Sequence, residues 1–142
     1  EIPPAAVLKG PVQYVQGIGP ERKAALAAAG IVTRQDLLDR GATPEGRAQI
    51  AEQTKISEKL IANWVSAVDL SRVPGVGPQS AELLQAAGVV TVAGLAQQDA
   101  AALHEKLVEV NASRNLVRVV PGVSQVARAI AAAKNLPEVV TV

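Results

Sequence analysis

Two short glycine turns carry the residues of this sequence with the clearest chemical potential. Residues 17–20 read Gly-Ile-Gly-Pro, and residues 75–78 read Gly-Val-Gly-Pro. Glycine permits a sharp turn and proline suits the first position of a helix, so each turn is expected to expose backbone N–H groups where a helix begins. The helix macrodipole adds partial positive charge there, which favours an anion such as a phosphate oxygen.

The two turns differ in the charges that follow them. Arg22 and Lys23 come directly after the first turn, whereas the second continues as Gln-Ser-Ala-Glu over residues 79–82, with no cation and one carboxylate. The first turn is therefore the better phosphate site, and the second is better interpreted as architecture. Alternatively, both turns are only structural hinges. The candidate nucleic-acid-binding residues are Gly17, Ile18, Gly19, Arg22, Lys23, Gly75, Val76 and Gly77.

Residues 111–136 hold several cations and no acid. They form a second basic patch if one helix presents Arg128 and Lys134 on the same face, with Arg114 or Arg118 nearby. A solvated face is the alternative interpretation, since runs of charge usually have that role. The members of this candidate patch are Arg114, Arg118, Arg128 and Lys134.

The sequence around the two turns repeats. Shifting it by 58 residues places residues 73–95 on residues 15–37, with 11 of 23 positions identical. Repetition at a fixed spacing indicates one supersecondary unit used twice. The predicted organisation is an N-terminal leader (1–11), two related domains (12–70 and 71–137) and a C-terminal tail (138–142).

Local signals predict helices throughout the chain. Pro20 and Pro78 begin helices that run through Ala- and Leu-rich sequence to Gly30 and Gly88, which favour left-handed helix stops. Further helices are expected after the N-caps Thr33 and Thr91, over residues 44–53, 58–68 and 100–110, and over residues 125–134 with Ser124 as the cap.

Strands are hard to place in this sequence. Residues 116–120 and 139–142 have a β-like composition, but each is equally compatible with an extended connection. Residues 120–124 read Val-Pro-Gly-Val-Ser, a weaker echo of the glycine turns in which serine replaces the second glycine. Whether this echo is a third turn stays open.

The pattern apolar-x-Gly-apolar-Gly-Pro, followed by Leu26 or Leu84 and then Ala-Ala-Gly, resembles the helix-hairpin-helix motif. With residues 42–47, residues 56–60 and Trp64, the chain is similar to a bacterial and archaeal family described only as a domain of unknown function with tandem helix-hairpin-helix motifs. Similar hairpins occur in the N-terminal domain of archaeal recombinases and the C-terminal domain of the RNA polymerase alpha subunit. The resemblance implies an all-α fold of two tandem helix-hairpin-helix domains, which contact phosphates without reading bases.

One position departs from the motif. Its helix usually has alanine four residues after the second glycine, and the second repeat keeps this residue as Ala81, whereas the first has Lys23. Either Lys23 extends its ammonium group outward along the surface, or the register of the first helix is slightly shifted.

Composition limits the other functions. Fourteen basic and thirteen acidic residues give a net charge of +1, so no global positive field would drive indiscriminate nucleic-acid binding. Binding of single strands by stacking needs exposed aromatic side chains. The chain has only Tyr14 and Trp64, and Trp64 falls in an apolar helix pattern typical of a core. Since Phe, Met and Cys are absent, the core must be built from Ala, Val, Leu and Ile.

No catalytic residue, cofactor or metal site is expected. His104 is the single histidine, whereas metal and nucleophile sites need several converging groups. No apolar run approaches the ~20 residues of a membrane-spanning helix, so no membrane insertion is expected. The compartment stays open, with the cytoplasm favoured, and a targeting segment removed from before Glu1 is compatible with the sequence.

Two functions are compatible with these features. The first is a non-catalytic helix-hairpin-helix module that contacts the backbone of double-stranded nucleic acid, as the motif implies. The second is a protein-interaction or scaffold subunit of a larger assembly with no nucleic-acid role. The near-neutral charge and the 49% hydrophobic content favour the second, as do apolar segments such as residues 136–142 that are expected to lack a cover in so small a fold.

Overall fold

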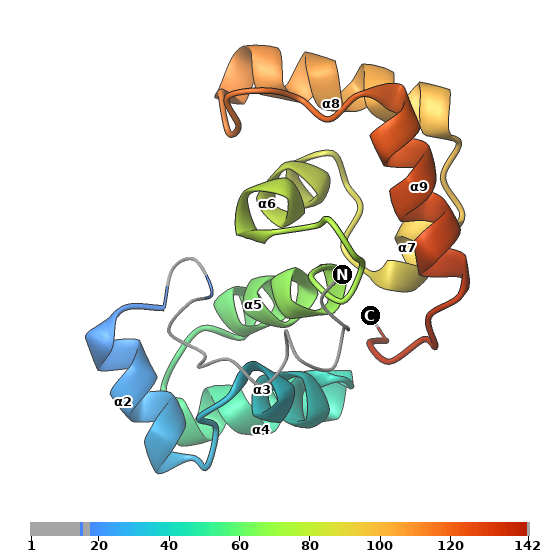
Figure 1. Cartoon of the computed structure of the whole chain (residues 1–142). Helices are drawn as coiled ribbons and strands as arrows, with labels where there is room; N and C mark the ends of the chain where they lie inside the picture. The colour runs from blue at the N-terminus through green and yellow to red at the C-terminus, as the bar shows by residue number, and fades with distance from the viewer. Residues whose placement is uncertain (1–14, 16–17, 142) are drawn as a thin grey trace.

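The computed structural model describes residue 15 and residues 18–141 of the chain. Within this part the protein forms eight helices and no strand, which confirms the all-α prediction. The expected leader (residues 1–11) and Gly17 lie outside the described residues. The helices are α2 (Pro20–Ala28), α3 (Arg34–Gly41), α4 (Pro44–Thr54), α5 (Glu58–Leu70), α6 (Pro78–Ala86), α7 (Val92–Ala96), α8 (Ala100–Arg114) and α9 (Val123–Lys134) (Figure 1).

Most helix boundaries follow the predicted local signals. The side chains of Thr33 and Thr91 cap α3 and α7, since each accepts a hydrogen bond from the backbone N–H three residues later. Gly30 and Gly88 adopt φ values of 88° and 93°, the left-handed conformation expected after α2 and α6. These predictions are confirmed because each depends on contacts within a few residues.

Helices α8 and α9 differ from their predicted bounds, and α4 and α5 end one and two residues later than predicted. The last helix begins at Val123 rather than Gln125, and its N-cap is Gly122 rather than Ser124. The Gln125 side chain accepts a hydrogen bond from the Gly122 N–H at 2.9 Å. This capping interaction from inside the helix allows the helix to begin two residues earlier than predicted. Helix α8 runs four residues past the predicted end and stops at the left-handed Asn115.

The echo at residues 120–124 does not have the geometry of the glycine turn at 75–78. Aligning the two places Gly122 on Gly75, but Gly75 has a φ of 88° and Gly122 a φ of −67°. The helix after Gly122 also begins at once, whereas α6 begins three residues after Gly75. Residues 120–124 are therefore a different helix start. The β-like segments 116–120 and 139–141 form no strand, and the first of them bends at residues 118 and 119.

The buried apolar side chains form two clusters. One contains Trp64 and the apolar faces of α2 to α5, and the other contains the apolar faces of α6 to α9. Ala67 on α5 packs against both, so α5 lies between the two cores (Figure 1). Trp64 is 3% exposed, which confirms its predicted place in a core.

The chain after α9 returns across both clusters. Leu136 packs against the second cluster, whereas Val139 and the buried Val140 pack against the first. The expectation that residues 136–142 lack a cover is therefore wrong for these three side chains. The two clusters supply the cover, and the sequence pattern of the segment itself does not reveal this.

Two buried arginines hold this returning segment by its backbone. Arg72 donates from Nη2 to the Pro137 carbonyl at 2.7 Å, and Arg47 donates from Nη2 to the Thr141 carbonyl at 2.7 Å. Arg47 also donates to the Gly41 carbonyl, at the end of α3. The Thr141 N–H donates in turn to the Ala42 carbonyl at 2.8 Å. The C-terminal segment is thereby attached to both halves of the molecule.

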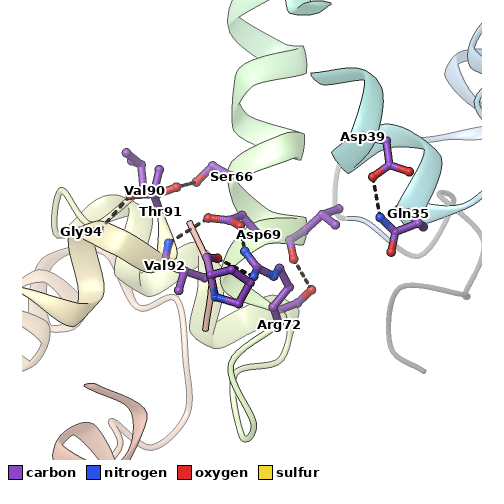
Figure 2. Close-up of polar contacts among 12 residues, drawn as sticks. Gln35, Asp39, Ser66, Asp69, Arg72, Val90, Thr91, Val92 and Gly94 are labelled. Carbon is purple, nitrogen blue, oxygen red and sulfur yellow. Dashed lines mark hydrogen bonds and ion pairs between the residues drawn. The ribbon is translucent and has the colours of Figure 1, made fainter. Parts of the chain in front are cut away.

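Asp69 is the most enclosed charged residue of this arrangement (Figure 2). It is 1% exposed, and its Oδ1 accepts from Arg72 Nη1 at 2.7 Å. Its Oδ2 accepts from the Val92 N–H, at the first residue of α7, at 2.8 Å. The neighbouring Ser66 hydroxyl donates to the Val90 carbonyl at 2.6 Å. The end of α5 therefore fixes the start of α7 through hydrogen bonds that are nearly free of water.

Substitution of Asp69 with alanine is expected to destabilise the fold by about 3–5 kcal/mol, because it leaves the Arg72 guanidinium buried without its counter-charge. Ser66→Ala, which removes a single neutral hydrogen bond, is the matched control, with an expected cost of about 1 kcal/mol. Both free energies of unfolding are measured by urea denaturation. Equal costs for the two variants would show that the ion pair does not hold the helices together.

Helix α3 obtains the corresponding cap from within its own first turn. Asp36 Oδ2 accepts from the N–H groups of Thr33 and Val32 at 3.0 and 3.1 Å, and Thr33 Oγ1 accepts from the Asp36 N–H. These backbone donors, Thr33 first and then Val32, hold the pKa of Asp36 below its usual 3.8. The position 58 residues later is Gly94, which has no side chain, so α7 takes its carboxylate from Asp69 instead.

Because the folded pKa of Asp36 is depressed, its contribution to stability is complete above the unfolded value of 3.8 and is lost as the pH falls through the lower, folded value. Asp36→Ala should therefore cost about 0.5–1 kcal/mol at neutral pH and progressively less below pH 3.8. Urea denaturation at a series of pH values measures this difference. The control is Asp39→Ala on the same helix, where the carboxylate accepts from the Gln35 side chain instead of the backbone (Figure 2). A cost of Asp36→Ala that does not change with pH would contradict the capping role.

Candidate functional site

The first glycine turn presents an exposed helix start. Ile18 is buried among the first cluster and its N–H donates to the Val15 carbonyl at 3.2 Å, which anchors the turn. Gly19 is exposed and is the N-cap of α2, with no side-chain cap. The backbone N–H groups in the first turn of a helix have no partner within the helix, so this start is suited to an anion.

Two cations and one acid lie on the first turn of α2. Arg22, Lys23 and Glu21 are all exposed. Glu21 lies in the same first turn and weakens the local positive charge. The Arg22 guanidinium carbon lies 5.8 Å from the centroid of the Trp64 ring, a cation–π distance. Buried Trp64 therefore helps to position Arg22 beside the turn, a contact that the sequence analysis did not identify.

From Val76 onward the second turn has the hydrogen bonds that the first has from Ile18 onward, but its surroundings differ. The Val76 N–H donates to the Val73 carbonyl at 3.1 Å, and Gly77 is an extended N-cap without a side-chain cap, as at Gly19. Gly75 is exposed, whereas Val76 and Gly77 are half-buried. The first turn of α6 carries no acidic residue, and Glu82 follows one turn later. This turn therefore lacks both the cations and the acid of the first.

The register of the two helices is the same at the position where they differ in residue type. Lys23 N–H donates to the Gly19 carbonyl at 2.9 Å, and Ala81 N–H donates to the Gly77 carbonyl at 2.9 Å. The alternative of a shifted register is therefore wrong. Lys23 is exposed and Ala81 fully buried, because α6 packs against α5 and α8 whereas α2 packs chiefly against α4.

The candidate basic patch requires Arg128 and Lys134 to share one face of a helix, and they do not. All four of its cations are exposed, but Arg128 and Lys134 lie six residues apart on α9. At about 100° per residue they point about 120° apart around the helix axis, so they do not share one face. Arg114 ends α8 and Arg118 lies in the connection that follows.

A cavity of about 490 Å³ lies beside the second turn. Its lining includes buried leucines from α6, α7 and α8, and also Gly75, Val76 and Arg128. Sequence reasoning missed this cavity. Its one signal was the absence of any aromatic residue after Trp64, which leaves the second cluster without a large side chain to fill space.

Metal ligands and membrane spans concern only the described part of the chain. Within it, no group of three His, Cys, Asp or Glu residues is placed to hold a metal ion. His104 is half-buried on α8. Among the same residues, no helix has the length and apolar character needed to cross a membrane.

The different packing of Lys23 and Ala81 leads to a testable difference in tolerance. Ala81→Lys is expected to cost about 3 kcal/mol or more, since it forces a charged, larger side chain between α5, α6 and α8. Lys23→Ala, its matched exchange on the exposed helix, should change stability by no more than about 0.5 kcal/mol. Urea denaturation measures both. Comparable losses would mean that α2 is buried as deeply as α6.

Comparison with known proteins gives one match, to a protein family. No curated protein and no solved structure matches the chain. Residues 16–136 match a family that is described as Domain of unknown function (DUF4332). Because this match covers most of the 142 residues, the chain belongs to the DUF4332 family.

Proposed function

We propose that the protein is a non-catalytic helix-hairpin-helix module that binds backbone phosphates of double-stranded nucleic acid at its first glycine turn, without reading the base sequence. The observation that carries this proposal is the start of α2. There an exposed glycine N-cap without a side-chain cap lies beside the exposed cations Arg22 and Lys23. Backbone N–H groups and cations together are the usual donors to phosphate oxygens.

The helix-hairpin-helix assignment rests on paired local geometry. Helices α2 and α6 each have nine residues, and each follows a glycine N-cap with extended backbone. After each helix, the Leu26 or Leu84 carbonyl accepts a hydrogen bond from the N–H five residues later, at 2.8 and 2.9 Å. A positive-φ glycine, Gly30 or Gly88, lies inside each of these closures. The same sequence spacing thus accompanies the same backbone path in both halves, which supports two related hairpin domains.

The charge distribution favours weak binding that is strongly dependent on salt. The net charge of +1 supplies no general attraction for a polyanion, so affinity must come from a few contacts at the turn. Glu21 reduces the local potential, which makes Arg22 and Lys23 individually important. Lys23 is the better probe, because Arg22 is also part of the contact with Trp64.

Lys23→Gln is expected to weaken binding to a fluorescently labelled duplex equally for unrelated sequences. It should also reduce the slope of log K against log salt concentration by about 0.9, the value for one lost phosphate contact. Fluorescence anisotropy over a salt series measures both effects. Lys106→Gln, which removes an exposed cation from α8, is the control and should leave the affinity and the slope unchanged. Absence of duplex binding at low salt, or equal effects of the two variants, would refute the proposal.

A second candidate function is protein interaction, which the exposed valines favour. These large apolar side chains lie on the surface in both halves, and Val119 is 82% exposed. Val32 and Val90 are 58 residues apart and are both exposed, so the repeat places an apolar side chain at equivalent sites. If the protein binds another protein, the Lys23→Gln variant should still retain that partner in a pull-down, and duplex binding should be absent. The exposed valines are Val32, Val90, Val108, Val119 and Val123.

A further inference from the structure

The chain beyond α9 is attached to the rest of the molecule at two separate places (Figure 1). Close to α9, the Pro137 carbonyl accepts from Arg72 Nη2 at 2.7 Å. Farther along, the Thr141 carbonyl accepts from Arg47 Nη2 at 2.7 Å, and the buried Val140 packs against the first cluster. One short segment is therefore held at the end of α5 and again on α4.

The two arginines at these places differ in how their charge is compensated. Arg72 keeps a counter-charge of its own, because Asp69 Oδ1 accepts from its Nη1 at 2.7 Å. Arg47 is 8% exposed, and within the described residues it donates to two backbone carbonyls and has no carboxylate at ion-pair distance. A buried charge without a counter-charge is unfavourable. Release of the Thr141 carbonyl returns Arg47 to water, whereas no such gain favours release at Arg72.

The segment between the two places has few contacts of its own. In the described part of the chain, residues 138 and 139 form no hydrogen bond, and Glu138 is exposed. Thr141 is also exposed, and it donates to the Ala42 carbonyl from its N–H at 2.8 Å and from Oγ1 at 3.3 Å. Val140 is the one buried side chain of residues 138–141. Segments with few buried contacts open without unfolding of the whole protein.

We propose that residues 138–141, named the strap, are hinged next to Pro137 and open as a unit while both helical halves stay folded. Arg72 holds the Pro137 carbonyl in the closed and the open state. The strap itself leaves the Ala42 carbonyl, Arg47 and the first cluster, so opening exposes this surface of the first half to water. This conformational device does not depend on phosphate binding at the first glycine turn.

Amide hydrogen exchange of the full chain, followed by NMR, tests this opening. The Thr141 N–H reports on the strap, and the Val92 N–H, which donates to Asp69 Oδ2, reports on the interior. Relative to an unfolded peptide, the Thr141 amide is expected to be protected, but at least about tenfold less than the Val92 amide. Its exchange should depend little on urea, because a short segment exposes little surface when it opens.

Val140→Ala is expected to accelerate exchange at Thr141 about tenfold, because it removes apolar contact from the closed strap only. Exchange at Leu136, whose N–H donates to the Ala133 carbonyl on the other side of the hinge, should not change. The guanidinium N–H protons of Arg47 should exchange through the same opening and respond equally to the substitution.

Val108→Ala is the matched control, because it makes the same exchange at an exposed position of α8, and it should leave Thr141 unchanged. The proposal is overturned if Thr141 exchanges at the rate and with the urea dependence of Val92, since the strap would then open only on global unfolding. It is also overturned by exchange at the rate of an unfolded peptide, by equal acceleration at Leu136 and Thr141, or by equal effects of the two alanine substitutions.

Discussion

The buried ion pair of Asp69 and Arg72 constrains more of this molecule than any local helix signal. A carboxylate that is 1% exposed is costly unless each of its oxygens has a partner, so the fold must bring donors to it from elsewhere in the chain. One donor is the first N–H of α7, and the other is Arg72. Because Arg72 also donates to the Pro137 carbonyl, one charge couples the end of α5, the start of α7 and the chain beyond α9.

The returning C-terminal segment extends this coupling to the first half. Arg47 donates a hydrogen bond to the Thr141 carbonyl, as Arg72 does to the Pro137 carbonyl, and both arginines are buried. Backbone carbonyls in an extended segment have no helix to satisfy them, so arginine donors replace the missing ladder. Leu136 and Val140 add apolar contacts to the second and first clusters respectively. The chain after the last helix thus connects the two clusters.

The helix starts at Gly19 and Gly77 have the same local hydrogen bonds in different surroundings. Both helix starts have the same spacing and the same i to i+4 hydrogen bond after the N-cap glycine. Packing then separates them: α2 keeps an exposed face for Arg22 and Lys23, while α6 is enclosed by α5 and α8 and needs an alanine there. The second turn also borders the cavity.

The amino-acid sequence by itself determined the helical content and most helix ends. Threonine caps, proline starts and left-handed glycines act through contacts within about five residues, so they do not depend on the rest of the chain. It also predicted the buried place of Trp64 and the unequal charge of the two turns. The start of α9 escaped prediction because two local caps competed, and the side chain of Gln125 prevailed over that of Ser124.

Only the tertiary structure decided which surfaces are available for binding. The exposure of Lys23 and the burial of Ala81 depend on which helices pack beside them, and the cover of Val140 comes from elements about a hundred residues earlier. The contact of Arg22 with Trp64 and the cavity under α8 and α9 likewise join residues that no periodic pattern connects. Local hydrogen bonds are encoded in short segments, whereas burial and cavities arise from the summed packing of all of them.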